Sequence, residues 1–588
     1  MRNIFWFGGA GIILVGIAVW ALFGRGLGGG ISNPLDAVAS LAMEPVKVSM
    51  ANSSTKKKWL EEAAKSFNAA SRSDGRLQVG GRPIEVEFIK EEIEPGQFDH
   101  YRSGTMVKDT VDERIRPDIA SPSEDSWLED LNRDWKAQKG RGEIISERPV
   151  GLVRIPLVIA MWQSRAEALG CWPQSRPECT WDRVRELAVH PAGWGMVNHP
   201  EWKKFKFGYG YVGESNSGTL TALLLCMTGL DKTSGLTIGD VTTDNACGQS
   251  IRQVEEAKVH SGKKSGWLLN WMKTGGPEYL DAVTTNEPEV ITFNQDNAGK
   301  LREPLVAAYP QDGTVVAAHP FGILDKAPWS TPEKVAAAKV FRDYLLSAEQ
   351  QRKALEYGLR PADPSTSLGA PFHPSNGVNP DATLNAVAVP DAATNEHLQD
   401  IWHKVKKHSA IVIVFDKSGS MSGDRITQAV KGAEAFVNAM DADDWLMWMP
   451  FDSVTYPMDQ GLKSAIGERL LSRIRSTSAD GGTALYEAVY QAHQLLEARR
   501  KDSGVRVRYG IVILSDGADT SSKRTLGELE ALLKPTEWDP TGVQIHAIGI
   551  GEANKDALSK IATTAHGKYW EADQADVARV YREIAAHY

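Results

Sequence analysis

The chain has 588 residues, of which 42% are hydrophobic and 24% are charged, an ordinary composition for a globular protein. At about 100–200 residues per domain, this length predicts about three or four domains, each large enough to bury its own core. The formal net charge is −9 and lysine and arginine are not clustered, which excludes a typical nucleic-acid-binding protein.

The first apolar segment, Ile4–Phe23, contains no charged residue. About 20 apolar residues match the ~30 Å hydrocarbon core of a bilayer, which favours an uncleaved transmembrane helix. A signal peptide is the alternative, but its apolar core is usually only about 7–15 residues long, and cleavage would have to occur further on, near Ala37–Ser40. We therefore expect residues 1–31 to form a single-pass anchor in the cell membrane with a glycine-rich tether, and the bulk of the chain to be extracytoplasmic.

Residues 45–407 alternate between short apolar strands and amphipathic helices, as in an α/β fold. The predicted strands are 46–50, 83–89, 117–120, 153–162 and 290–294, and 305–309 with 314–318 could form a hairpin. The predicted helices are 58–70, 220–229, 332–346, 348–357 and 395–407. This order, with the segments Ala51–Thr55, Ser215–Thr219 and Tyr357–Pro361, resembles a periplasmic solute-binding protein of the two-lobed kind that serves molybdate or sulfate uptake.

Serine and threonine residues open several of these helices, where a helix presents unpaired N–H groups and the positive end of its dipole. Such positions suit a small solute that is an oxyanion or carries many hydroxyls. The candidate solute-binding residues are Ser53, Ser54, Ser121, Ser123, Ser215, Ser217 and Thr219. The alternative is that these residues are only helix caps, a role in which serine and threonine are favoured in any protein.

The cysteines form two locally spaced pairs, Cys171 with Cys179 and Cys226 with Cys247. An even number of cysteines beyond a membrane span fits disulfide bonds in an oxidising compartment. Proximity alone favours these two pairings, since three connectivities are available to four cysteines. Four buried free thiols are the alternative, whereas no Cys-x-x-Cys spacing supports zinc.

Residues 408–588 alternate more regularly than the rest of the chain. The predicted strands are 410–415, 445–451, 505–514, 543–551 and 568–571, and the predicted helices are 424–440, 462–474, 483–499, 526–533, 555–562 and 575–585. Near-continuous Val, Ile and Leu strands between helices predict a parallel, Rossmann-like sheet that is covered on both faces. The helix at 395–407 runs almost directly into this domain, so we expect a restricted rather than a floppy joint.

Polar side chains follow two of these strands. The segment Asp416-Lys417-Ser418-Gly419-Ser420 comes after the first strand, Asp516 follows the third, and Thr483 opens a helix. In parallel sheets, ligands bind at the carboxyl ends of the strands, which is where Asp416 and Asp516 fall. Carboxylate and hydroxyl oxygens are the hard ligands that Mg²⁺ prefers.

This pattern resembles the von Willebrand factor A domain, whose metal-ion-dependent adhesion site has the sequence D-x-S-x-S, then a Thr, then an Asp followed by Gly. Asp416, Ser418, Ser420, Thr483 and Asp516 match all five positions. The resemblance implies that the three hydroxyls bind Mg²⁺, or Mn²⁺ or Ca²⁺, directly, and that the two carboxylates bind it directly or through water. It also implies a protein partner that offers an acidic residue to the metal.

The sequence contains no Gly-x-x-x-x-Gly-Lys-Ser/Thr phosphate loop, no His-Glu-x-x-His zinc helix and no Gly-x-Ser-x-Gly elbow. His546 lies within an apolar strand and is expected in the core rather than acting as a base. A metal site without a companion base or nucleophile favours a binding protein over an enzyme.

We therefore expect a membrane-anchored extracytoplasmic protein that binds a small solute in one domain and a protein partner through Mg²⁺ in the other. Three alternatives stay open at this point. The chain could be an accessory that delivers solute to an ABC transporter, a regulator like those of calcium-activated chloride channels, or a metal-dependent hydrolase.

Overall fold

The computed structural model describes residues 44–588 except 95–96, 214, 263–264, 504–506, 517, 535–541, 552–553, 574–575 and 586–587. The expected membrane helix at Ile4–Phe23 and the tether after it lie outside these residues. Within the described part of the chain, no helix is both long enough and apolar enough to cross a membrane.

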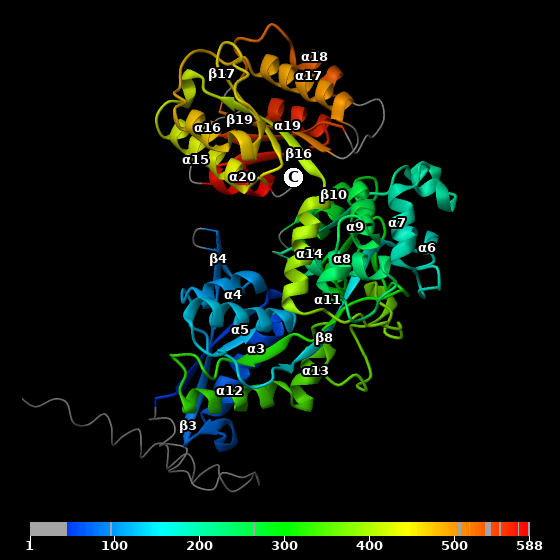
Figure 1. Ribbon diagram of the computed structural model, residues 1–588, viewed down its shortest axis with the longest axis vertical. Coiled ribbons are helices and arrows are strands. Elements are labelled where there is room, and N and C mark those ends of the chain that lie inside the picture. The colour runs from blue at the N-terminus through cyan, green and yellow to red at the C-terminus, as the bar shows by residue number, and fades with distance from the viewer. Residues whose placement is uncertain are drawn as a thin grey trace, which may run out of the picture. The chain divides into compact units, whose positions relative to one another are not determined.

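The chain divides into two compact units (Figure 1). The first contains the residues up to Ile155 together with Ala317–Phe372, and the second contains Pro156–Val316 together with His373–Tyr588. The chain therefore passes between the units at 155–156, 316–317 and 372–373.

The first unit is a six-stranded sheet with the order β2-β3-β1-β6-β14-β7. Its strands are β1 (Val46–Asn52), β2 (Gln78–Val79), β3 (Arg82–Ile89), β6 (Ile119–Ser121), β7 (Val150–Gly151) and β14 (Pro320–Ile323), and β4 (Glu91–Glu94) pairs separately with β5 (Gln97–Asp99). Side chains alternate between the faces of a strand, so Val48 and Met50 enter one core while Ala51 enters the other.

Helices cover both faces of this sheet. One face packs against α3 (Lys57–Ser71), α12 (Pro332–Leu345) and α13 (Ala348–Glu356), and the other against α4 (Ser103–Val111) and α5 (Ser126–Lys139). Trp59 and Phe67 of α3 are buried in the core on one side of the sheet. Leu128 and Trp135 of α5 are buried in the core on the other side. The loops after β1 and β6 lie at the same edge, because these strands are parallel neighbours.

The second unit begins with a sheet of the order β10-β9-β11-β8-β12. Its strands are β8 (Val153–Trp162), β9 (Phe207–Gly210), β10 (Lys258–Gly262), β11 (Ala282–Asn286) and β12 (Leu305–Ala308), and the short strands β13 (Val316–Ala317) and β15 (Arg360–Pro361) also pair with β8. Its helices are α6 (Gln163–Ala168), α7 (Trp181–Val189), α8 (Asn216–Gly229), α9 (Ala246–Ala257), α10 (Ser265–Gly275), α11 (Glu287–Asp296) and α14 (Ala392–Val405). Helix α8 is almost entirely apolar or small and lies inside the core, against α7, α9 and α14.

The C-terminal domain is a sheet of the order β18-β17-β16-β19-β20-β21. Its strands are β16 (His408–Asp416), β17 (Trp445–Phe451), β18 (Gln460–Leu462), β19 (Val507–Ser515), β20 (Gln544–Ile550) and β21 (Tyr569–Ala572). The helices α15 (Asp424–Ala439), α16 (Lys463–Arg475) and α20 (Val577–Ala585) cover one face, and α17 (Leu485–Ser503), α18 (Leu526–Leu533) and α19 (Lys555–Thr564) cover the other (Figure 1). All neighbouring strands are parallel except β17 and β18.

Two predicted elements are wrong. Residues 290–294 belong to α11, not to a strand, because Pro288 near its first position starts a helix that then buries Val290, Ile291 and Phe293. The segments 305–309 and 314–318 do not form a hairpin with each other, since β12 and β13 both pair with β8. The mixed α/β class and the parallel C-terminal sheet are confirmed.

Candidate metal centre

The five residues predicted to bind metal lie at one edge of the C-terminal sheet. Asp416 ends β16, and Asp516 follows the end of β19, its parallel neighbour. Ser418 and Ser420 lie in the turn between β16 and α15, and Thr483 lies in the loop that precedes α17. The structure therefore places all five residues in three loops at the same edge of the sheet.

Hydrogen bonds connect four of these residues into one chain. The Ser418 N–H donates to Asp416 Oδ1 at 2.8 Å, and the Ser418 and Ser420 hydroxyls lie 3.0 Å apart. The Ser420 hydroxyl donates to Asp516 Oδ1 at 2.8 Å. The Ser515 hydroxyl donates to the other oxygen of Asp416 at 2.5 Å, which fixes the orientation of that carboxyl group.

Backbone hydrogen bonds hold the three loops against one another. The Gly419 N–H donates to Gly481 O at 2.9 Å, which ties the turn after β16 to the loop that carries Thr483. The Thr483 N–H donates to Thr520 Oγ1 at 2.9 Å and Thr483 O accepts from Thr520 N–H at 2.8 Å, which ties that loop to the one after Asp516. A Cβ atom on Gly482 would lie 2.4 Å from Ser521 Oγ, so a larger residue here would require the Ser521 side chain to move.

The site is open on one side. Asp416, Ser418, Thr483 and Asp516 are buried, whereas Ser420 is exposed. Burial raises the pKa of the Asp416 carboxyl above its ordinary value, and the charge of Asp516 adds to this, while hydrogen bonds from Ser418 and Ser515 oppose it. A nearby cation would favour the ionised form of such a carboxyl group.

The donors suit a hard cation that binds oxygen. Three hydroxyls and two carboxylates provide only oxygen ligands, the chemistry of Mg²⁺, Mn²⁺ or Ca²⁺ rather than of zinc. In the residues that the structure describes, no group of three or more His, Cys, Asp or Glu side chains is arranged to hold a metal ion. The hydroxyl-rich cluster around Ser420 is thus the candidate metal site.

Arg425 is a residue of this site that the motif did not identify. It lies in the first turn of α15, and its guanidinium donates to Asp516 Oδ2 at 2.8 Å and to Ser420 O at 3.3 Å. The signal in the sequence was a basic residue soon after D-x-S-x-S, at the start of the next helix. Its partner Asp516 lies 91 positions further on, so the sequence pattern alone does not reveal the contact.

The serine residues predicted to bind solute in the first unit use their hydroxyls within the fold. Lys56 Nζ donates to Ser53 Oγ at 2.8 Å, and the Ser121 hydroxyl donates to Pro320 O at 2.6 Å. Ser123 accepts from the Ser103 hydroxyl at 3.2 Å. These three serines are buried, whereas Ser54 is only partly buried.

Lys56 and Glu124 are buried ionisable groups beside these serines. Lys56 is 1% exposed, and its ammonium also donates to Ser121 O at 2.8 Å and to Pro122 O at 3.1 Å. Burial lowers the pKa of Lys56 well below its ordinary value. Glu124 is 8% exposed, and burial raises its pKa to about 8.

The remaining predicted solute residues lie in the second unit, before and within the first turn of α8. The Ser215 and Ser217 hydroxyls are 3.0 Å apart, and Thr219 Oγ1 accepts from the Gly213 N–H at 2.9 Å. All three side chains are buried. They stabilise the turn that leads from β9 into α8.

Both predicted disulfide bonds are confirmed. Cys171 pairs with Cys179 and Cys226 pairs with Cys247, and the structure contains no free cysteine. All four cysteines lie in the core of the second unit, and the bond between Cys226 and Cys247 joins α8 to α9. His546 is also a core residue, as predicted, because its side chain is buried in β20. This burial lowers its pKa to about 3.

A buried carboxylate joins the two sheets of the second unit. Glu255, at the end of α9, accepts from Lys258 Nζ at 2.8 Å and from Trp402 Nε1 at 3.2 Å. It also accepts from the Lys407 N–H at 3.3 Å and pairs with Arg508 Nη2 at 3.8 Å. Burial disfavours its ionisation, but the charges of Lys258 and Arg508 more than offset this and hold its pKa at about 2. We refer to these five residues as the Glu255 cluster.

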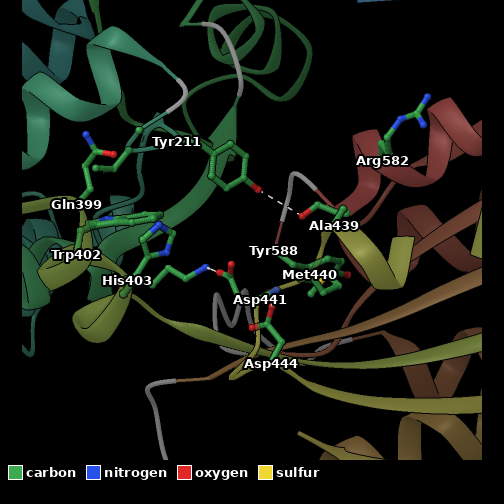
Figure 2. A pocket seen from close by; sticks show the side chains of 14 residues that line it. Tyr211, Gln399, Trp402, His403, Ala439, Met440, Asp441, Asp444, Arg582 and Tyr588 are labelled. Atoms are coloured by element: carbon green, nitrogen blue, oxygen red, sulfur yellow. Dashed lines mark hydrogen bonds and ion pairs between the residues drawn. The ribbon is translucent and has the colours of Figure 1, made fainter. Parts of the chain in front are cut away.

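A cavity of about 450 Å³ lies close to this cluster (Figure 2). Tyr211, Gln399, Trp402 and His403 line it from one side, and residues of the C-terminal domain line it from the other. Lys406 forms an ion pair with Asp441, and the Tyr211 hydroxyl donates to Ala585 O at 3.3 Å. Polar contacts from Lys406 and Tyr211 therefore connect the two sides of this cavity.

Two family models match the chain. Residues 48–360 match the bacterial extracellular solute-binding protein family, and residues 410–581 match the von Willebrand factor type A domain. Such domains are typically binding modules without catalysis, and the type A domain commonly binds a divalent metal ion at its adhesion site. Asp416, Ser418, Ser420, Thr483 and Asp516 all lie within the residues that match this domain.

Individual proteins are more distantly similar. The uncharacterized protein sll0103 of Synechocystis sp. is 27% identical over 159 residues, which are 27% of this chain and 36% of that protein. The chain thus spans about a third of the length of this relative. Among solved structures, a periplasmic thiamin binding protein is 12% identical with a TM-score of 0.40, covering 62% of this chain and 96% of its own. A von Willebrand factor type A protein from Catenulispora acidiphila is 19% identical with a TM-score of 0.27, covering 31% of this chain and 42% of its own.

Proposed function

Because this chain belongs to the bacterial extracellular solute-binding protein family and carries a C-terminal von Willebrand factor type A domain, we propose that it couples solute binding to metal-dependent binding of a protein partner. We further propose that it acts outside the cytoplasm, anchored to the cell membrane by residues 1–31. The family match supports the location, and the apolar segment Ile4–Phe23 supports the anchor.

The observation that carries the partner-binding half of this proposal is the hydrogen-bonded chain from Asp416 through Ser418 and Ser420 to Asp516. Its hydroxyls and carboxylates would hold Mg²⁺ together with Thr483, and the exposed Ser420 marks the side from which a partner approaches. When bound, the ion offers an open coordination position to a carboxylate. Because Mg²⁺ prefers six ligands, a glutamate or aspartate of the partner would complete its shell.

The Glu255 cluster supports coupling between the two functions. Lys407 immediately precedes β16 and Arg508 is the second residue of β19, and these are the strands that end at the candidate metal site. On the other side of the cluster, the Tyr209 hydroxyl accepts from Trp402 Nε1 at 3.0 Å, and Tyr209 lies in β9, the strand that leads into the turn at Ser215. A shift of this turn would therefore be transmitted to buried charges at the base of both metal-site strands.

Metal-dependent stability tests the proposal directly. An ion that binds only the folded state stabilises it by RT ln(1 + [L]/Kd), about 2.7 kcal/mol at a hundredfold excess over Kd. We expect Mg²⁺ or Mn²⁺ to raise the melting temperature of the purified full-length protein, and Asp416→Ala or Thr483→Ala to abolish the rise. Glu468→Ala, an exposed carboxylate on α16, is the matched control and should retain it.

An unchanged melting temperature of the wild-type protein across a metal titration would refute metal binding. The partner is tested separately, by a pull-down that should be lost both with EDTA and in Ser418→Ala. Mass spectrometry of small molecules carried by the purified protein identifies the solute. A protein that never carries or binds a solute would leave only the metal-dependent half of the proposal.

A further inference from the structure

Arg425 contacts one oxygen of the Asp516 carboxylate, and the candidate metal site contacts the other. Asp516 Oδ1 accepts from the Ser420 hydroxyl at 2.8 Å, and Oδ2 accepts from Arg425 Nη1 at 2.8 Å. The Asp516 side chain is 0% exposed and that of Arg425 is 32% exposed. One oxygen thus faces the hydroxyl cluster while the other is neutralised by a cation at the rim of the site.

The fold holds this arginine in place. Gly423, with φ +82°, directs the chain into α15, so that Arg425 falls in the first helical turn. The guanidinium lies over Gly551, which follows β20, and a Cβ atom on that glycine would be 3.3 Å from Nη2. Three segments that are distant in sequence therefore converge on the contact between Arg425 and Asp516.

The neighbouring cation, Lys417, does not play this role. Its ammonium pairs with Asp452 and lies 4.7 Å from the centre of the Tyr456 ring. This ion pair balances its own charge, which leaves Arg425 as the basic group in contact with the hydroxyl and carboxylate chain. Asp480 accepts from the Gly481 N–H, and Asp519 accepts from the Tyr486 N–H of α17 and from the Ser522 hydroxyl.

A charge count shows what Arg425 does to the site. The two carboxylates, Asp416 and Asp516, would exactly neutralise a divalent ion, because each contributes one negative charge. With Arg425 in contact, the loaded site retains one positive charge. Like charges within a partly buried site repel, so the arginine lowers the affinity of the site for the metal alone. It also strengthens the attraction of the loaded site for an anion.

We propose that Arg425 is the specificity-determining residue that makes an acidic partner necessary for tight metal binding. This inference rests on the proposed metal site. Because binding of metal and carboxylate are linked, each raises the affinity for the other by the same factor. Arg425 lowers the affinity for the metal alone and raises the affinity of the loaded site for a carboxylate, so the site is weakly loaded when alone and strongly loaded when a partner carboxylate is present.

Mn²⁺ binding, measured by the electron paramagnetic resonance signal of the free ion, tests this inference on the purified full-length protein. Arg425→Met, which removes the charge, should bind Mn²⁺ about fivefold more tightly than the wild-type protein without added carboxylate. Adding acetate at constant ionic strength, with chloride as the comparison, should tighten Mn²⁺ binding by the wild-type protein and have less effect on Arg425→Met.

Two further variants separate charge from geometry. Arg425→Lys keeps the positive charge but loses the planar guanidinium, so it should behave like the wild-type protein. Lys431→Met removes an exposed charge from the same helix and should change nothing. Melting temperatures without metal check that each variant is folded.

The outcomes are distinguishable. A wild-type protein that does not bind Mn²⁺ refutes the metal site itself. Equal Mn²⁺ affinity and equal acetate response in wild type and Arg425→Met refute the inference alone. Weaker Mn²⁺ binding in both Arg425→Met and Arg425→Lys would also overturn it, because Arg425 would then only orient Asp516.

Discussion

The loops at the metal site and the serine-rich loops of the first unit have similar compositions but use their hydroxyls differently. At the metal site, Ser418 and Ser420 bond to each other and to Asp516, and the chain ends at an exposed hydroxyl. In the first unit, Ser121 bonds to a backbone carbonyl and Ser53 to a buried lysine. The first arrangement places several oxygen atoms together at a surface. In the second, the hydroxyls form hydrogen bonds within the interior of the fold.

This difference shows that spacing is more informative than abundance. Carboxylate and hydroxyl side chains at alternate positions after a strand place several oxygen atoms around one point. The D-x-S-x-S pattern has this spacing. Serines at separate helix starts carry no such constraint, because each one can satisfy the backbone of its own loop. Three predictions test this difference between the two regions.

The largest effect is expected from Lys56→Met. Its ammonium donates to the carbonyls of Ser121 and Pro122, and the loss of these bonds would leave buried acceptors unsatisfied. We expect the first unit to lose about 2–5 kcal/mol of unfolding free energy. Urea titration with hydrogen exchange of peptides from β1 and β6 measures this, and Lys58→Met, an exposed lysine in the first turn of α3, is the control. Unchanged exchange would show that Lys56 serves a ligand rather than the fold.

Glu124→Gln tests the buried carboxyl beside the same serines. In the folded state its pKa is raised to about 8, so its contribution to stability is present below pH 4.5, the ordinary value, and is lost as the pH rises toward 8. The wild-type protein should therefore lose on the order of 3 kcal/mol relative to Glu124→Gln between these pH values. Melting curves across that window measure the difference.

The matched control for Glu124→Gln is Glu143→Gln, an exposed glutamate in the loop after α5, which should follow the wild-type pH dependence. A parallel pH dependence of the wild-type protein and Glu124→Gln would mean that Glu124 stays ionised. The serine-rich loop would then contain a charged carboxylate, and an anionic solute there would be disfavoured.

The smallest effect on stability is expected from single hydroxyl deletions. Ser123→Ala and Ser418→Ala each remove one hydroxyl and should each cost about 1 kcal/mol or less without metal. Only Ser418→Ala should lose the rise in melting temperature on adding Mg²⁺. If Ser123→Ala instead abolished solute binding while Ser418→Ala kept its response to metal, the comparison between the two loops would be reversed.

Much of the C-terminal domain could be predicted because its signals are local. An apolar run such as Ile411–Phe415 identifies a buried strand, and the polar residues after it fall at the sheet edge by topology alone. The short strand β18 was missed because Gln460–Leu462 is neither apolar nor alternating and pairs only at the edge.

The errors and omissions share a physical cause, which is dependence on partners far away in sequence. The 305–318 region looked like a hairpin because its segments are adjacent, but β8 offers both of them a buried partner about 150 residues earlier. The run at Val290 is the exception, because it is ambiguous between strand and helix and the nearby Pro288 in the first turn favours the helix. Glu255 and Arg425 also contact charged groups far away in the sequence, Arg508 and Asp516.

The two disulfide bonds have a consequence for how the protein is made. Their pairings are consecutive along the chain, 171 with 179 and then 226 with 247, and neither encloses a cysteine of the other. During export with the N-terminus first, as the proposed location requires, the first bond can close before the third cysteine emerges. Each thiol then meets its correct partner next, so an oxidase alone should suffice and no isomerase should be needed to correct mispaired intermediates.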